Sequence, residues 1–495
     1  MLPNLAKYLL GIFYCFSATF IMAQHDEYLN YKIPHQRVAA DLELLHSVLS
    51  ESHPGFDLYL NHHEIDSLFS QRIPSAGLTF TETYSHLASL IDHIHDGHTN
   101  VHLNEELSDY ILSTQRFFPF TLKFIDGLAY VDHNFSEHEY MDRGCQVLAI
   151  NGMDINCIVE ELLPFITCDG APRGAKFEQL EGQFWWFYAL RFGFKSTFRL
   201  HYCDVFERED YQAKNLVVTA IRYSDRFDLL QEVYGFGHRA PASKMDFDIK
   251  DGIGFLTINQ FHGISKINYG MFLSKCFRIL EDREVESLVI DIRENGGGRE
   301  GFENMLLSYL PHTLNEKYDL VEIRSVESSY YQFMKGATKN RFSDFLYRTF
   351  EFKETDDAWM RRDRFQRTLL HQDPQFLGDV YVLIGGEVFS GGSDFASMAK
   401  SYVPRCTLIG TETLGGATAN SSGYFYRLIL PNSGLVVEIP RVLFQLNVPV
   451  AQCNRGVVPD IEVNQTLDDF LAGRDHVMNK AIEIVGERQE IAKIR

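Results

Sequence analysis

The sequence predicts an α/β fold whose core repeats a buried strand followed by a helix. Short apolar runs bounded by glycines are typical of buried strands, and apolar residues three and four apart are typical of helices. Repeated pairs of a strand and a helix indicate crossover connections within one sheet. The expected strands lie at 251–261, 287–298 and 380–384, and the helices that follow them lie at 273–280, 301–310 and 394–402.

Length and composition indicate a folded protein with more than one domain. The chain has 495 residues, of which 45% are hydrophobic and 13% aromatic, and this is enough for two or three domains with cores of their own. Its 46 Lys and Arg residues against 67 Asp and Glu residues give a net charge of -21. This acidic balance argues against nucleic acid and against anionic lipid surfaces as partners.

Residues 1–23 predict a secretory signal peptide. A positive charge at Lys7 precedes an uncharged apolar run, which ends at Ala23 before a polar stretch. The run is short for a membrane span and ends like a cleavage site, although an uncleaved anchor stays the alternative. We therefore expect a secreted or periplasmic protein without a stable membrane span after cleavage.

The cysteines do not indicate a metal centre. Of the eight, Cys15 lies in the signal peptide, and the other seven show no CxxC spacing. Neither a zinc site nor a dense disulfide framework is therefore expected, and an odd number leaves at least one thiol unpaired. Cys157 and Cys168 stay open as a possible pair.

Residues 24–115 predict a small helical region, with helical spacing at 38–49 and 84–94. It ends in the motif DGHT at 96–99, among histidines at 93, 95, 98 and 102. His95 and His98 are three residues apart, as in some metal sites, but no glutamate completes an HExxH arrangement. We expect no metal and no cofactor here.

Residues 116–238 predict a β-rich domain. Short alternating segments lead to a strand, an Ile-Asn-Gly turn and a helix, an order that resembles the PDZ-like folds, which receive an extended peptide as an added strand. The aromatic stretch 177–194 covers a hydrophobic core or, alternatively, contacts a peptide. A linker is expected at 239–244, and 311–377 is expected to be an elaborated crossover or a lid.

Ser390 lies on the turn between the strand at 380–384 and the helix that follows. Gly391 and Gly392 permit a sharp turn, and free amides at the start of a helix stabilise a developing negative charge. This arrangement is typical of a nucleophile elbow, although the letters are not GxSxG. The alternative is that Ser390 only caps the helix, because serine is a preferred N-cap residue.

Beyond the elbow, a hairpin is expected with its turn at 431–434. It is followed by the strand-like segment RGVVPDIEV and by one amphipathic helix over 468–489.

Four motifs, in this order and at these separations, resemble the C-terminal-processing (tail-specific) serine peptidases, a family that includes the tricorn core protease. They are LVIDIRENGGG, VYVLIGGEVFSGGSDFA, IGTETLGG and RGVVPDIEV. The resemblance implies a crotonase/ClpP-like core of ββα units over 245–475, and we expect a C-terminal helix at 476–495 after this core. It also implies that Ser390 is the nucleophile and that the amides of Gly297 and Gly391 form the oxyanion hole.

The resemblance also bears on the general base. One branch of the family has a lysine in the segment where this chain has Gly415 and Gly416, so a Ser/Lys dyad is not assigned. The tricorn-like branch uses a histidine, and His98 in DGHT matches it in context. The residue that orients His98 stays open, because Cys453 stands where tricorn-like members have a glutamate. Glu412 is the first candidate for this role and Asp96 the weaker one.

The resemblance implies a serine endopeptidase that binds peptides or unfolded proteins and forms an acyl-enzyme through Ser390, and the expected signal peptide makes it a secreted or periplasmic one. The alternative is a catalytically inactive protein that binds a peptide or a small ligand on the same fold, because fold does not fix function. A crotonase-like acyl-CoA enzyme is disfavoured, because secretion would separate it from coenzyme A.

Overall fold

The computed structural model describes residues 29–494 except 30, 71–72, 139–140, 205–212, 235–244, 356–357, 366–367 and 450–453. The predicted signal peptide, the whole of the expected linker and Cys453 lie outside the described residues. No helix among the residues that are described has the length and apolar character needed to cross a membrane.

The N-terminal region is helical, as its spacing predicts. Its helices are α2 (His35–Ser52), α3 (His62–Phe69), α4 (Phe80–Asp92) and α5 (Glu105–Thr114). A capping box between Thr79 and Glu82 begins α4, because each side chain bonds the backbone amide of the other residue. Two short pairs of antiparallel strands accompany these helices. They are β1 (Lys32–Ile33) with β2 (Leu78–Thr79) and β4 (Arg116–Phe117) with β11 (Ile221–Arg222).

The β-rich part contains one antiparallel sheet with the strand order β10-β9-β7-β6-β5, and β8 pairs with β7. The strands are β5 (Phe120–Ile125), β6 (Leu128–Asn134), β7 (Gln146–Ile150), β8 (Met153–Asp154), β9 (Thr197–Cys203) and β10 (Lys214–Thr219). The helical elements are α6 (Ile155–Leu162), η1 (Leu163–Phe165), α7 (Arg173–Phe192) and α8 (Tyr223–Tyr234).

The aromatic stretch 177–194 belongs mainly to α7. Phe184, Phe187 and Tyr188 of this helix are buried in the main hydrophobic core. The interpretation of this stretch as the cover of a core is therefore confirmed. The PDZ-like assignment and the exact domain boundaries stay predictions.

The predicted α/β core is built on a sheet with the order β12-β13-β14-β18-β19-β22. All neighbours are parallel except β12 and β13, which are antiparallel. The strands are β12 (Met245–Lys250), β13 (Ile253–Ile258), β14 (Ser287–Asp291), β18 (Asp379–Ile384), β19 (Cys406–Gly410) and β22 (Ile461–Glu462).

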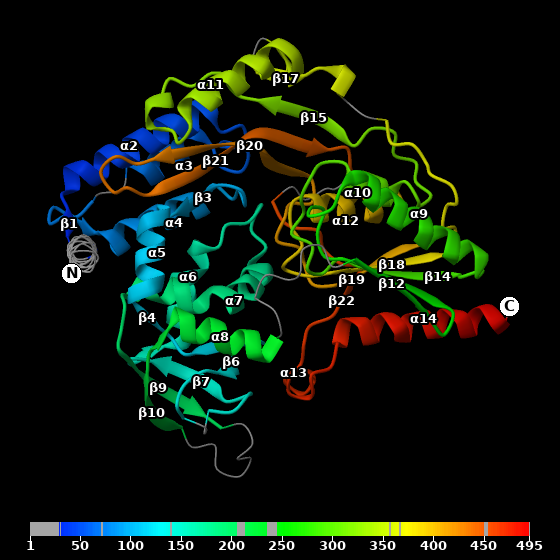
Figure 1. Ribbon diagram of the computed structural model, residues 1–495, viewed down its shortest axis with the longest axis horizontal. Coiled ribbons are helices and arrows are strands. Elements are labelled where there is room, and N and C mark those ends of the chain that lie inside the picture. The colour runs from blue at the N-terminus through cyan, green and yellow to red at the C-terminus, as the bar shows by residue number, and fades with distance from the viewer. Residues whose placement is uncertain are drawn as a thin grey trace, which may run out of the picture.

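Helices cover both faces of this sheet (Figure 1). Leu288, Ile290 and Val382 face one cluster, with α9 (Lys266–Asp282), α10 (Phe302–Leu307) and α12 (Gly391–Tyr402). Val289 and Leu383 face the opposite side, against α14 (His476–Ile494). Successive side chains of a strand point to opposite faces, so a sheet covered on both sides needs continuously apolar strands.

A third sheet has the order β16-β17-β15-β21-β20, and β3 pairs with β21. Its long hairpin turns where the sequence predicts, and in Figure 1 it lies beside the N-terminal helices. Its strands are β3 (Asn100–His102), β15 (Tyr318–Ile323), β16 (Phe352–Glu354), β17 (Trp359–Arg361), β20 (Ala419–Ile429) and β21 (Val436–Leu446). The segment 311–377 contributes β15 to β17 together with η2 (Tyr331–Phe333), α11 (Ala337–Leu346), η3 (Tyr347–Glu351) and η4 (Asp363–Phe365).

One expectation from the sequence is wrong, and one possibility that it left open does not occur. The helix expected over 468–489 is divided into α13 (Leu467–Ala472) and α14, because Gly473 adopts φ +63° and ends the first helix. Cys157 and Cys168 are not joined, since each is a free thiol, the first exposed and the second buried.

Candidate active site

Ser390 lies between β18 and α12 in a backbone conformation that non-glycine residues rarely adopt. Its φ is +52° and its ψ is -125°, and strain of this kind is typical of functional sites. The residue occupies the N-cap position of α12, yet its side chain makes no capping hydrogen bond. The alternative that Ser390 only caps the helix therefore has no geometric support. Its side chain is partly exposed and so accessible to a substrate.

The backbone around Ser390 leaves room for only glycine at two places. A Cβ atom at Gly297, where φ is +91°, would lie 2.8 Å from Cβ of Ser390. A Cβ atom at Gly415 would lie 2.8 Å from the backbone nitrogen of Ser390. Both loops thus approach the serine more closely than a side chain would permit.

The two expected oxyanion donors differ in their surroundings. Gly391 begins α12, so its amide has no acceptor within the helix and can bind an anion. The amide of Gly297 instead donates to Oδ1 of the buried Asn295, at 2.9 Å. The amide of Gly297 would have to break its bond to Asn295 before it could donate to a substrate oxygen.

The strand β3 brings His98 to the core although the two are far apart in the sequence. β3 pairs with β21 through Val101 and Val437, and the DGHT turn precedes it directly. The imidazole of His98 lies against the phenyl ring of Phe389, with centroids 4.4 Å apart and an interplanar angle of 32°. His98 is therefore packed on the residue that precedes Ser390.

Burial lowers the pKa of His98 below its usual 6.5, although the charges of Asp96 and Glu438 act in the opposite direction. A neutral imidazole at neutral pH is the form that a general base requires. Among the described residues, Nδ1 of His98 has no hydrogen-bond partner, and no hydrogen bond joins His98 to Ser390. Catalytic hydrogen bonds are often long in free enzymes and tighten when substrate binds.

Asp96 and the buried His53 hold the DGHT turn. Oδ1 of Asp96 accepts the amide of His98 at 2.9 Å and the hydroxyl of Thr99 at 3.0 Å, which is the arrangement of an Asx turn. Nε2 of His53 lies 2.8 Å from the same hydroxyl and 3.6 Å from Oδ2 of Asp96. Asp96 thus shapes the turn, the role that its position in the sequence predicts.

Glu412, the first candidate for orienting His98, lies in an ion pair with Arg455. Nε and an Nη atom of the guanidinium donate to its two oxygens at 3.0 and 2.9 Å. This pairing raises the pKa of Arg455, chiefly through the hydrogen bonds that its guanidinium donates to Glu412. The structure does not bring Glu412 to His98.

Asp169 is a buried carboxyl group near His98 that the sequence analysis does not single out. Asp96, His98 and Asp169 each offer one ligand atom, and these atoms lie within 4.8 Å of one another. The set has the donor types of a metal site, but amides already occupy both oxygens of Asp169, at 2.8 Å from Gly97 and 3.1 Å from Gly416. The motifs alone do not indicate Asp169, because it follows the β-rich segments and precedes α7.

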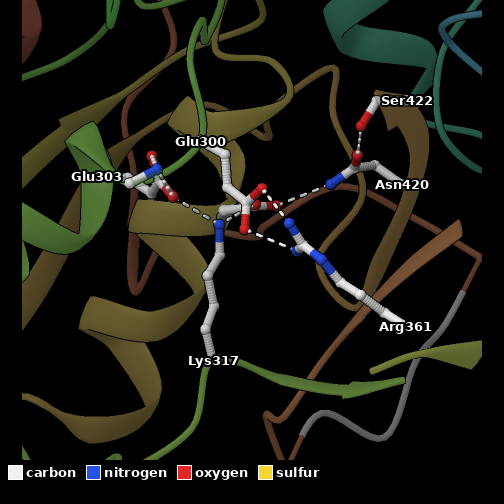
Figure 2. A network of polar contacts seen from close by, with 8 residues as sticks. Glu300, Glu303, Lys317, Arg361, Asn420 and Ser422 are labelled. Atoms are coloured by element: carbon white, nitrogen blue, oxygen red, sulfur yellow. Dashed lines mark hydrogen bonds and ion pairs between the residues drawn. The ribbon is translucent and has the colours of Figure 1, made fainter. Parts of the chain in front are cut away.

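A buried ion cluster lies at the first turn of α12, and Figure 2 shows part of it around Lys317. Lys317 Nζ lies 2.8 Å from Glu303 and 2.7 Å from Asp394, whose backbone amide bonds the carbonyl of Ser390 at 2.9 Å. Asn420 donates to Asp394 at 3.0 Å and accepts from Ser422 at 2.7 Å. The cluster therefore joins β20 to the first turn of α12.

Neither lysine near α12 suits the role of base. Burial alone would lower the pKa of Lys317, but the charges of Asp394 and Glu303 raise it well above the ordinary value, so the amine stays protonated. Lys400 donates to the carbonyl of Val458 at 2.6 Å and pairs with Asp460 at 3.0 Å. Both lysines are thus held by carboxylates.

Residues 252–463 match the sequence profile of peptidase family S41. This part of the chain is an S41 peptidase domain. The resemblance that the four motifs predict is therefore confirmed, and with it a serine-type peptidase and its mixed α/β core. No curated protein sequence matches the chain.

Solved structures with a similar fold span nearly the whole chain. Mature CPAF complexed with lactacystin is 14% identical, with a TM-score of 0.58 over 91% of this chain and 97% of that one. A second structure, of mature CPAF, is also 14% identical, with a TM-score of 0.56 over 88% of this chain and 94% of that one. At this identity the likeness concerns the fold.

The S41 domain does not contain the whole candidate site. Ser390, Gly297, Gly391 and Glu412 lie within the matched range, whereas His98 precedes it. The site is therefore completed by the N-terminal region.

Proposed function

We propose that the protein is a serine endopeptidase of the C-terminal-processing type that cleaves peptide bonds through Ser390, with His98 as general base. The observation that carries the proposal is the strained, uncapped backbone of Ser390 at the start of α12, on a loop whose Phe389 packs against His98. A strained turn of this kind presents a serine hydroxyl for attack.

The proposed reaction is acyl transfer. Oγ of Ser390 attacks the carbonyl carbon of the substrate while its proton passes to His98. The amide of Gly391 stabilises the negative oxygen of the tetrahedral intermediate. His98 then gives the proton to the leaving amine. In the second half of the reaction, water attacks the acyl-enzyme while its proton passes to His98, and His98 returns the proton to Oγ of Ser390 as the acid product leaves.

The proposal includes a place and a substrate class. The apolar N-terminal stretch with Lys7 and Ala23 favours export to the periplasm or the medium. The β-rich sheet before the S41 domain favours an extended peptide or an unfolded protein as substrate, because such a sheet can take up a further strand. Glu412 stays a candidate residue of the site only through its motif, since its ion pair with Arg455 favours a structural role.

Labelling with a fluorophosphonate tests the proposal, because this reagent reacts with activated serines. We expect one adduct on the wild-type protein, mapped to Ser390 by peptide mass spectrometry, and none on Ser390→Ala. Lys400→Ala serves as the matched control on the same helix and should be labelled normally. Absence of labelling in a folded wild-type protein would instead favour an inactive binding protein on the same fold.

A further inference from the structure

The segment 167–171 lies between the loop that carries His98 and the core loop that touches Ser390. On the first side, Thr167 Oγ1 donates to the carbonyl of Gly97 at 3.1 Å, and the amide of Gly170 donates to the carbonyl of His95 at 2.9 Å. On the second side, the amide of Asp169 donates to the carbonyl of Leu414 at 3.2 Å. The segment therefore bonds both loops through its backbone and a hydroxyl.

The side chain of Asp169 joins the same two loops directly. Oδ1 accepts the amide of Gly97, the residue before His98, at 2.8 Å. Oδ2 accepts the amide of Gly416 at 3.1 Å. A single carboxyl group thus bridges two loops whose sequence positions differ by more than half of the chain.

The second loop is in contact with the nucleophile. The amides of Leu414 and Gly415 donate to the carbonyl of Val388 at 3.0 and 3.1 Å, two residues before Ser390. The approach of Gly415 to the Ser390 nitrogen leaves no room for a Cβ atom between them. A displacement of this loop would therefore also displace the backbone of Ser390.

We propose that Asp169 is a positioning residue, which holds the His98 loop in register with the Ser390 loop so that the histidine can reach the serine hydroxyl. The inference rests on the proposed function, and it adds a residue outside the S41 domain and outside the four motifs.

The two accepted amides make this bridge selective for a carboxyl group. Asp169 is 2% exposed, and its burial together with the charge of Asp96 raises its pKa well above the ordinary value. The amides of Gly97 and Gly416 partly offset this by bonding its oxygens. An asparagine would have the same size but only one acceptor oxygen, so one of the two loops would lose its bond.

The chain contains a matched control in Asp41. It is 1% exposed, and it too bridges distant segments by accepting backbone amides, from Asn432 at 3.1 Å and from Ser433 at 2.8 Å. Asp41→Asn therefore removes a comparable bridge at the β20–β21 turn.

The test is a double-mutant cycle with His98. We expect Asp169→Asn to lower kcat on the order of ten- to a hundredfold with little change in KM, because small displacements of catalytic groups have effects of this size. In a His98→Ala background, where an activated ester reports the residual rate, the same substitution should have no further effect. Asp41→Asn should leave kcat unchanged in both backgrounds.

The results distinguish a failure of the positioning role of Asp169 from a failure of the proposed function. An equal loss of kcat from Asp169→Asn with and without His98 would overturn the positioning role, because a general structural effect does not depend on the histidine. If His98→Ala hydrolyses peptides as fast as the wild-type protein, the proposed function itself is overturned. If Asp169→Asn does not fold, Asp169→Glu takes its place in the cycle. It keeps both acceptor oxygens but displaces the loops by a methylene, so the same His98-dependent loss is expected.

Discussion

The imidazole ring of His98 packs on the phenyl ring of Phe389 with 4.4 Å between the centroids. The same phenyl ring leaves no room for a Cβ atom at Gly97, because that atom would lie 2.5 Å from Cε2 of Phe389. The residue before the nucleophile thus forms a surface for the residue that we propose as base, and for the glycine before it.

This contact predicts that Phe389→Ala lowers kcat by about tenfold or more, because His98 loses the surface that orients its ring. The variant is to be compared with Phe425→Ala, since Phe425 also lies near the imidazole but at a centroid distance of 6.1 Å. Initial rates at saturating peptide give kcat for both. A larger loss for Phe425→Ala than for Phe389→Ala would contradict the assignment.

Gly297 predicts a steric effect on the nucleophile. Gly297→Val should lower kcat by roughly a hundredfold or more, the scale of a lost oxyanion donor, because its Cβ atom would press against Ser390 and the amide of Gly391. Gly336 is the control, because it also has a positive φ but open space around its Cβ position. Gly336→Val should keep the wild-type kcat, and equal losses in the two variants would point to backbone strain alone.

The lowered pKa of His98 predicts the acidic limb of the pH profile. The base works when neutral, so activity falls as the pH drops through the pKa of His98 in the folded enzyme. Because burial lowers this pKa below 6.5, kcat/KM should still be above half of its maximum at pH 6.5 and should reach the half-maximal point at a more acidic pH. A half-maximal point above 6.5 would mean that another group, or an exposed histidine, sets the limb.

The ion cluster below α12 predicts a large effect on stability. Lys317→Met leaves Glu303 and Asp394 buried without their cation and should lower the free energy of unfolding by about 3–5 kcal/mol. Lys400→Met removes a partly exposed pair with Asp460 and should cost about 1 kcal/mol or less. Urea unfolding followed by circular dichroism measures both. Similar midpoints for the two variants would show that the buried cluster is not a main support of the fold.

The elements of the core could be predicted because their signals are local. The strand before Ser390 is buried on both faces and therefore apolar throughout, and the glycines after it mark the turn. The division of the C-terminal helix at Gly473 was missed, since a glycine within a helical pattern is often tolerated.

The parts of the site that could not be predicted depend on contacts between distant segments. β3 is only three residues long, and its pairing with β21 has no signal in either strand alone. Asp169 and Lys317 resemble ordinary charged residues in the sequence, and only the fold shows that they are buried. Glu412 illustrates the converse, because its motif drew attention to it while its partner Arg455 lies in another segment.

The most direct test of the account is kcat for peptide hydrolysis by Ser390→Ala, His98→Ala and the double variant, with wild type as reference. Members of one catalytic unit fail together, so each single variant should lose on the order of a thousandfold or more, and the double variant should be no worse than the singles. Wild-type levels of hydrolysis by His98→Ala, or losses that multiply in the double variant, would contradict the pairing of Ser390 with His98.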